Sequence, residues 1–107
     1  MKNILVTGSA GFIGSNLVKR LFAEMTEGTI VGLDNLNDYY DVSLKDYRLK
    51  QLETLHSQLT LNSNPYTLNY EFVKGDLADK ALIDRLFAEH KFDIVVNLAA
   101  QAVSDIV

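Results

Sequence analysis

A glycine-rich segment between a short apolar run and an amphipathic segment constrains the fold of this chain more than any other feature. Residues 4–6 are Ile-Leu-Val, which predicts a short strand buried on both faces. Three of the chain's six glycines then fall within residues 7–14. From there to about Met25, apolar residues recur every three or four positions, as on one face of a helix. A strand that turns through glycines directly into a helix predicts the start of a parallel α/β sheet.

The rest of the chain continues this alternation. Apolar runs predict strands at about residues 29–34, 70–75 and 94–98, and helical periodicity predicts helices at about 43–58 and 80–89. Residues 35–41 and 61–68 are expected to be loops. We therefore predict one domain over residues 1–107 with a partial Rossmann-type α/β fold. Its βαβαβαβ order gives a parallel sheet with strand order 3-2-1-4 and helices on both faces.

Individual residues add detail to this prediction. Asp79 is a good N-cap for the helix at 80–89, and Ser43 with Asp46 resembles a capping box. His56 and His90 lie near predicted helix ends without metal-ligand spacing, so we expect solvated side chains and no metal site. The expected buried positions of the helix at 43–58 and just beyond it are Leu44, Leu52, Leu55 and Leu59.

Composition excludes several classes of protein. The chain has 107 residues, of which 48% are hydrophobic and 22% are charged, as in an ordinary globular domain. A net charge of −4 argues against nucleic-acid binding, and the absence of cysteine excludes disulfides and thiolate zinc sites. No apolar run approaches the roughly 18 residues of a membrane span. We therefore expect a soluble, cytoplasmic protein with no membrane or nucleic-acid partner.

Each glycine of the segment has a predicted task. Gly8 allows a tight turn out of the strand, Gly11 removes a Cβ where a pyrophosphate would approach, and Gly14 lets the helix pack closely on the sheet. The N-terminus of the following helix offers free N–H groups and the positive end of its dipole. The alternative is a plain strand-to-helix turn with chance glycines. The position between a strand and an amphipathic helix favours a dinucleotide site.

A carboxylate ends the second predicted strand. Asp34 comes 20 residues after Gly14, where an acidic side chain accepts hydrogen bonds from both ribose hydroxyls of an adenosine. It would repel a 2′-phosphate, so the sequence favours NAD over NADP. The alternative is a loop aspartate without a ligand. Asn35 either bonds the same ribose or shapes the turn.

Two further segments follow predicted strands. Asp76 and Leu77 suit the amino group and ring face of an adenine, or else Asp76 is a second capping residue near Asp79. Small residues after the fourth strand would let a cofactor lie across the strand end, or else serve close helix–sheet packing. This second segment consists of Leu98, Ala99, Ala100 and Gln101.

These segments together resemble the extended short-chain dehydrogenase/reductase family. The likeness rests on Thr-Gly-x-x-Gly-x-x-Gly at 7–14, Gly-Asp-Leu at 75–77 and Asn-Leu-Ala-Ala at 97–100. More narrowly, residues 34–41, 43–45, 72–79 and 98–102 are similar to the UDP-glucuronate 4-epimerase branch of that family. The resemblance covers residues 1–102.

The resemblance implies a bound NAD that oxidises a nucleotide-sugar at C4 and returns the hydride to the other face of the keto intermediate. It assigns Asp34 and Asn35 to the ribose, and Asp76 and Leu77 to the adenine. The residues it assigns to the nicotinamide side are Leu98, Ala99, Ala100 and Gln101. The residues it assigns to the pyrophosphate are Gly8, Gly11, Phe12, Ile13 and Gly14.

The chain departs from the family pattern near its end. The family's catalytic Ser/Thr and Tyr-x-x-x-Lys lie beyond the fourth strand, and residues 103–107 replace the usual continuation. We therefore expect no catalytic residue here, an absent substrate half and no activity by this fragment alone. Three alternatives stay open: a non-enzymatic NAD-binding or regulatory module, a sugar-nucleotide dehydratase fragment, and a folded remnant that binds nothing.

Two further features of the sequence concern a possible catalytic pair and the edge of the sheet. Tyr70 and Lys74 match Tyr-x-x-x-Lys as text, but on a strand they would lie about 13 Å apart, too far for the lysine to act on the tyrosine. The fourth strand is very apolar and has a free edge, which is a pairing liability. We therefore predict self-association of the chain, most simply as a symmetric dimer.

Overall fold

The computed structural model describes residues 2–36, 42–62 and 65–98. Four strands form one parallel sheet: β1 (Asn3–Thr7), β2 (Thr29–Asp34), β3 (Asn69–Lys74) and β4 (Ile94–Asn97). Three helices connect them in strict alternation: α1 (Phe12–Glu24), α2 (Val42–Asn62) and α3 (Lys80–His90). The strand order is β3-β2-β1-β4, which confirms the predicted 3-2-1-4 arrangement.

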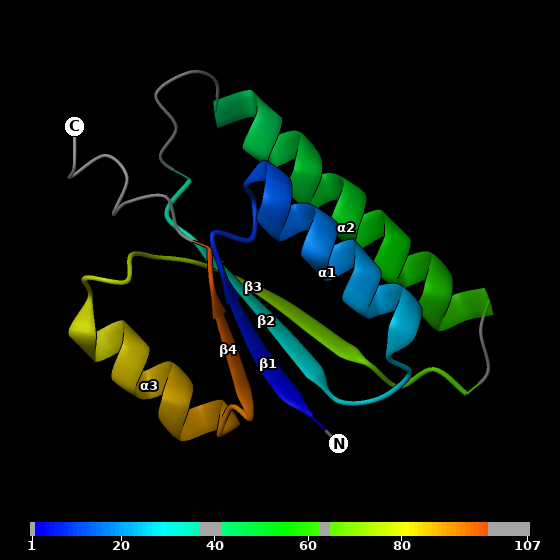
Figure 1. Ribbon diagram of the computed structural model, residues 1–107. Helices are drawn as coiled ribbons and strands as arrows, with labels where there is room; N and C mark the ends of the chain where they lie inside the picture. Colours follow the sequence, from blue (N-terminus) through cyan, green and yellow to red (C-terminus); the bar gives the residue numbers. More distant parts are fainter. Residues whose placement is uncertain (1, 37–41, 63–64, 99–107) are drawn as a thin grey trace.

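Helices cover both faces of the sheet, as predicted. Helices α1 and α2 lie together on one face, and α3 lies on the other (Figure 1). The strands sort their side chains accordingly, because successive residues of a strand point to opposite faces. Ile4, Val6 and Ile30 belong to the core beneath α1 and α2, whereas Leu5 and Val31 belong to the core beneath α3. Two separate hydrophobic cores therefore sandwich the sheet.

The core beneath α1 and α2 is the larger one. Phe22 of α1 is fully buried, and its ring meets the ring of Tyr70 edge-on at 5.1 Å between centroids. Burial of a large apolar side chain contributes about 1.5–3 kcal/mol. The hydroxyl of the buried Tyr66 donates to the carbonyl oxygen of Phe22, which ties the segment before β3 to α1. The buried members of the core beneath α1 and α2, among the described residues, are Ile4, Val6, Val18, Phe22, Ile30, Leu52, Tyr66 and Leu68.

The second helix differs from the prediction in two ways. It continues to Asn62, four residues past the expected end, and therefore takes up the first two residues of the expected 61–68 loop. Leu52 is buried, and Leu55 and Leu59 pack partly buried against the core, as predicted. Leu44 is exposed, so its predicted burial is wrong. It lies in the first helical turn, about 12 Å along the axis from Leu52, where the buried contact begins.

The expectation that both histidines are solvated is also wrong. His56 lies inside the longer helix, with Nε2 2.7 Å from the carbonyl oxygen of Leu68 and its ring 5.3 Å from that of Phe22. His90 stacks on Phe92, because the chain reverses at Lys91 with a left-handed φ of 48°. Neither histidine is therefore fully solvated. His56 contacts a carbonyl oxygen and an aromatic ring, and His90 contacts an aromatic ring.

Candidate functional site

The glycine segment is a tight loop between the carboxyl end of β1 and the start of α1. Gly8 adopts φ 69°, a left-handed conformation that favours glycine, which fits its predicted turn. Its N–H donates to the carbonyl oxygen of Leu33 at 2.8 Å, and its own carbonyl accepts from Gly11 N at 3.0 Å. The loop is thus anchored to the neighbouring strand β2 as well as to itself.

The start of α1 packs directly on this loop. A Cβ on Gly14 would overlap the carbonyl oxygen of Gly8 and would lie 3.0 Å from Cα of Ser9. The close approach predicted for Gly14 is therefore present, and it is made to the loop at the strand end. At Gly11 a Cβ would be 3.2 Å from the Gly8 oxygen, which is tight but leaves the approach from solvent open.

The amino end of α1 has the features of an anion site. Its N-cap, Gly11, supplies no side-chain acceptor, so the N–H groups of the first turn face outward. Phe12 and Ile13 are 69% and 67% exposed, which is high for large apolar side chains. A 13-residue helix presents the positive end of its dipole here. These features fit the pyrophosphate of a dinucleotide, which needs backbone donors rather than lysine or arginine.

Asp34 ends β2 beside this loop and is almost completely buried. Its Oδ2 accepts from Ala10 N at 3.0 Å, and its Oδ1 accepts from Leu36 N at 2.7 Å and from Lys45 Nζ at 3.0 Å. Leu36 reaches the carboxylate because it adopts φ 60°. An ionised carboxylate has about four lone-pair sites, and three are used by these internal donors.

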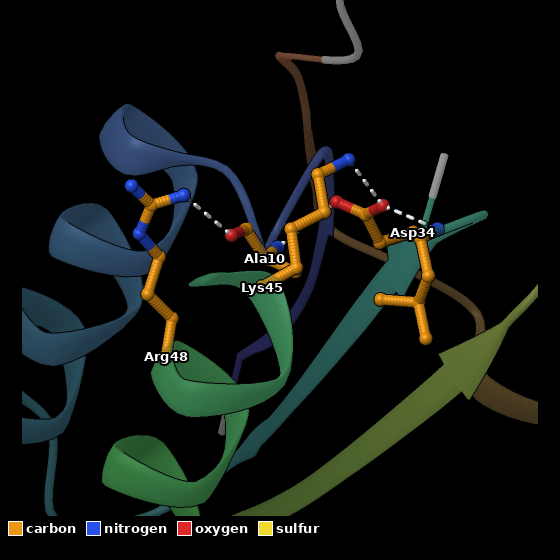
Figure 2. A network of polar contacts seen from close by, with 5 residues as sticks. Ala10, Asp34, Lys45 and Arg48 are labelled. Carbon is orange, nitrogen blue, oxygen red and sulfur yellow. Dashed lines mark hydrogen bonds and ion pairs between the residues drawn. The ribbon is translucent and has the colours of Figure 1, made fainter. Parts of the chain in front are cut away.

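Two cations of α2 lie against the same corner (Figure 2). Lys45 forms the ion pair with Asp34, and the two side chains are 14% and 3% exposed. Arg48, one turn later, donates from Nη1 to the carbonyl oxygen of Ala10 at 3.3 Å. Its guanidinium also lies 6.0 Å from the ring centre of Phe12. Helix α2 is therefore joined by polar contacts to both the glycine loop and the end of β2.

The predicted adenine segment lies after β3. Asp76 accepts from Ala78 N at 2.9 Å through Oδ1, and its carbonyl accepts from Asp79 N at 3.0 Å. Leu77 packs against the core beneath α3. Asp79 accepts from Leu82 N at 3.1 Å, which confirms its predicted role as N-cap of α3. Asp76 shapes the turn before that cap, and its carboxylate stays at the carboxyl edge of the sheet.

The end of β4 is bonded to the end of β1. Thr7 donates from Oγ1 to Oδ1 of Asn97 at 2.6 Å, and Leu98 N donates back to Oγ1 of Thr7 at 3.0 Å. The predicted residues Ala99, Ala100 and Gln101 lie outside the described residues. Asn35 is described and exposed next to Asp34. Thus the glycine loop, Asp34, Asp76 and Leu98 all lie at the carboxyl ends of parallel strands, where ligands bind in open α/β sheets.

Tyr70 and Lys74 both lie on β3, as predicted, which rules out the one-turn spacing of a helical pair. Burial, with Glu53 nearby, raises the pKa of Tyr70 to about 12. A catalytic tyrosine needs the opposite shift. Tyr70 is therefore a core residue.

Three parts of the site were not predicted from the residues alone, namely Lys45, Arg48 and Thr7. The only available signal for the two cations was their spacing of three residues near the start of the helix that follows Asp34.

Among residues 2–36, 42–62 and 65–98, no three His, Cys, Asp or Glu side chains gather as metal ligands. Within the same residues, no helix has the length and apolarity needed to cross a membrane.

Comparison with known proteins agrees with this geometry. The profile of the NAD dependent epimerase/dehydratase family matches residues 4–106. UDP-glucuronate 4-epimerase 3 of Arabidopsis thaliana is 41% identical over 100 residues, which are 94% of this chain and 20% of that protein.

Two solved structures, both in complex with NAD, share the fold. The dTDP-glucose 4,6-dehydratase of Bacillus anthracis str. Ames superposes with a TM-score of 0.68 and 29% identity, over 97% of this chain and 28% of that one. The UDP-glucuronic acid 4-epimerase of Bacillus cereus gives a TM-score of 0.65 and 31% identity, over 91% and 26% of the two chains. The chain thus spans about a quarter of the length of the relatives it matches. It belongs to the NAD-dependent epimerase/dehydratase family and has the Rossmann-type cofactor fold of that family.

Proposed function

We propose that this chain is the NAD-binding part of a nucleotide-sugar epimerase of the UDP-glucuronate 4-epimerase type. The observation that carries the proposal is the glycine loop on the amino end of α1, with the Asp34 carboxylate beside it. The similarity to UDP-glucuronate 4-epimerases supports the branch. The likeness to a dTDP-glucose 4,6-dehydratase, with the higher TM-score of 0.68, makes a dehydratase the second candidate.

In this proposal the backbone of the loop and of the first turn of α1 holds the pyrophosphate at Gly8, Gly11, Phe12, Ile13 and Gly14. Asp34 and Asn35 bind the adenosine ribose, and Asp76 and Leu77 contact the adenine. The segment assigned to the nicotinamide side is Leu98, Ala99, Ala100 and Gln101. Bound NAD supplies a hydride acceptor for the sugar C4, and this chain's own residues orient it.

We further propose that the 107-residue chain does not turn over substrate by itself. Tyr70–Lys74 is the one Tyr-x-x-x-Lys in the sequence, and it lies on a strand with the tyrosine in the core. The UDP-sugar is then a partner of the longer protein, in the cytoplasm. Turnover of UDP-glucuronate by the purified chain, measured by chromatography of the sugar products, would contradict this proposal.

Self-association is proposed at β4. This strand pairs with β1 on one side, and Ile94 and Val95 are exposed. An apolar strand edge favours pairing with a second copy. Sedimentation velocity should show a dimer of the 107-residue chain, and Val95→Lys should give a monomer. A wild-type chain that sediments as a monomer at high concentration would refute the proposal.

Cofactor binding is tested by calorimetric titration with NAD. The wild-type chain should bind, and Asp34→Asn should weaken binding at least tenfold, because an amide cannot accept hydrogen bonds through both of its atoms. Asp84→Asn on the exposed face of α3 is the matched control and should bind like wild type. Circular dichroism verifies that the variants are folded. Absence of NAD binding by the folded wild-type chain would overturn the proposed function in favour of a remnant fold.

A further inference from the structure

The charge of Asp34 is not isolated in this structure. Its Oδ1 lies 3.0 Å from Nζ of Lys45, and the two side chains are 3% and 14% exposed. Solvent therefore screens this pair weakly, because little water reaches either charge. The repulsion of a 2′-phosphate expected from a lone carboxylate at the end of β2 is offset by the ammonium beside it.

A second cation is bonded to the same loop residue that binds Asp34. Ala10 donates its N–H to Asp34 at 3.0 Å and accepts from Arg48 at 3.3 Å through its carbonyl oxygen. Lys45 and Arg48 are three residues apart, so both point from one side of α2 toward this corner (Figure 2). These contacts bring two cations of α2 to the corner that holds the Asp34 carboxylate.

We propose that Lys45 is a specificity-determining residue that sets how strongly the site prefers NAD over NADP. The inference rests on the proposed function, because it concerns the ribose end of the same cofactor site. With Lys45 in place, the carboxylate is neutralised, and a phosphomonoester of charge −1.5 to −2 is tolerated. Arg48 strengthens this tolerance, because a guanidinium matches phosphate oxygens geometrically. Without Lys45, the buried carboxylate acts as a lone charge and excludes NADP.

Ordinary structural support is the competing role for Lys45. The ion pair joins the start of α2 to the end of β2, so its loss could loosen the corner without affecting specificity. A structural role lowers the affinities for NAD and NADP by the same factor. A specificity role changes their ratio. The ratio of the two dissociation constants therefore separates these roles, whatever happens to stability.

The experiment is a titration of the 107-residue chain with NAD and with NADP at about pH 8, where carboxylates and phosphomonoesters are ionised. Lys45→Met keeps the length of the side chain and removes its charge, whereas Lys45→Arg keeps the charge. Lys50→Met, at an exposed position of the same helix, is the matched control. Asp34→Asn retains Lys45 and removes the carboxylate.

In Lys45→Met, the preference for NAD over NADP should rise at least tenfold above the wild-type value. Lys45→Arg and Lys50→Met should keep the wild-type ratio, and Asp34→Asn should lower it. An unchanged or lower ratio in Lys45→Met overturns the inference while NAD binding by the wild type leaves the proposed function standing. If the folded wild type binds neither dinucleotide, the proposed function fails, and the specificity role fails with it.

Discussion

A Cβ on Gly14 would occupy the same space as the carbonyl oxygen of Gly8. Gly14, in the first turn of α1, therefore packs directly on the backbone of Gly8, the residue after β1 and six positions earlier in the sequence. This contact sets the height of the helix above the loop. It links the fold to the proposed site, because the same loop presents the N–H groups at the amino end of α1.

Gly14→Ala should force the helix away from the loop. Overpacking of this kind costs about 1–3 kcal/mol of unfolding free energy. We expect that loss in urea denaturation, with weaker NAD binding in the same variant. Arg20→Ala on the exposed face of α1 is the control and should change stability by less than about 0.5 kcal/mol. A Gly14→Ala variant as stable as wild type would show that the loop adapts.

The two buried serines near the loop should respond in opposite directions to alanine. Ser9 Oγ is buried without a hydrogen-bond partner among the residues that the structure describes, so Ser9→Ala removes an unsatisfied group and should raise stability by about 1 kcal/mol. Ser15 Oγ donates to the carbonyl oxygen of Phe12 at 3.2 Å, so Ser15→Ala should lower stability by a similar amount. Thermal unfolding of both variants checks this. Equal effects of the same sign would contradict it.

Tyr70 should make the fold sensitive to alkali. Its pKa is raised from 10.0 to about 12 by burial and by Glu53, so the folded chain holds the proton more tightly than the unfolded chain. The contribution of Tyr70 to the free energy of unfolding should therefore be constant below pH 10 and should be lost between pH 10 and about 12.

Tyr70→Phe should remove most of this fall in stability. Because the hydroxyl is buried without a partner within the described part of the chain, the variant should be at least as stable as wild type at pH 7. Urea denaturation at several pH values provides the measurement. A Tyr70→Phe variant with the wild-type alkaline slope would assign that slope to other groups.

The N-cap of α3 should contribute measurably to stability. Asp79 accepts a hydrogen bond from Leu82 N at 3.1 Å, and replacement of such a cap by alanine costs about 0.5–2 kcal/mol. Asp79→Ala should therefore lower the midpoint of urea unfolding. Asp84→Ala is the control, because its ion pair with Lys80 lies on the exposed face of the same helix. Equal losses in the two variants would show that charge, and not capping, is responsible.

The topology could be predicted because each buried strand carries its own apolar signature. The run of Ile4 to Val6, the glycines that follow it and the Asp79 cap are local patterns whose meaning does not depend on the remaining chain. The end of α2 could not be placed the same way. Residues 59–62 lack a helix-stopping glycine or proline, so the helix continues to Asn62.

Contacts between residues far apart in the sequence could not be predicted from local patterns. Nothing local shows that His56 meets the carbonyl of Leu68 or that Lys45 reaches Asp34, because each contact joins residues that lie 11 or 12 positions apart in the sequence. The sequence indicated a carboxylate at the end of β2 but not the charge beside it. The positions Ala99, Ala100 and Gln101 stay predictions.

The two cores on opposite faces of the sheet are unequal, and this has a consequence for how the domain opens. Among the residues that the structure describes, the core beneath α1 and α2 has eight buried members, and the core beneath α3 has four, Leu5, Val31, Leu33 and Leu86. Regions with fewer buried apolar contacts open locally at lower free energy. Helix α3, whose one buried residue is Leu86, therefore forms the less protected unit. We expect its amide hydrogens to exchange with solvent through partial opening, and those of β1 and β2 to exchange only when the whole domain unfolds.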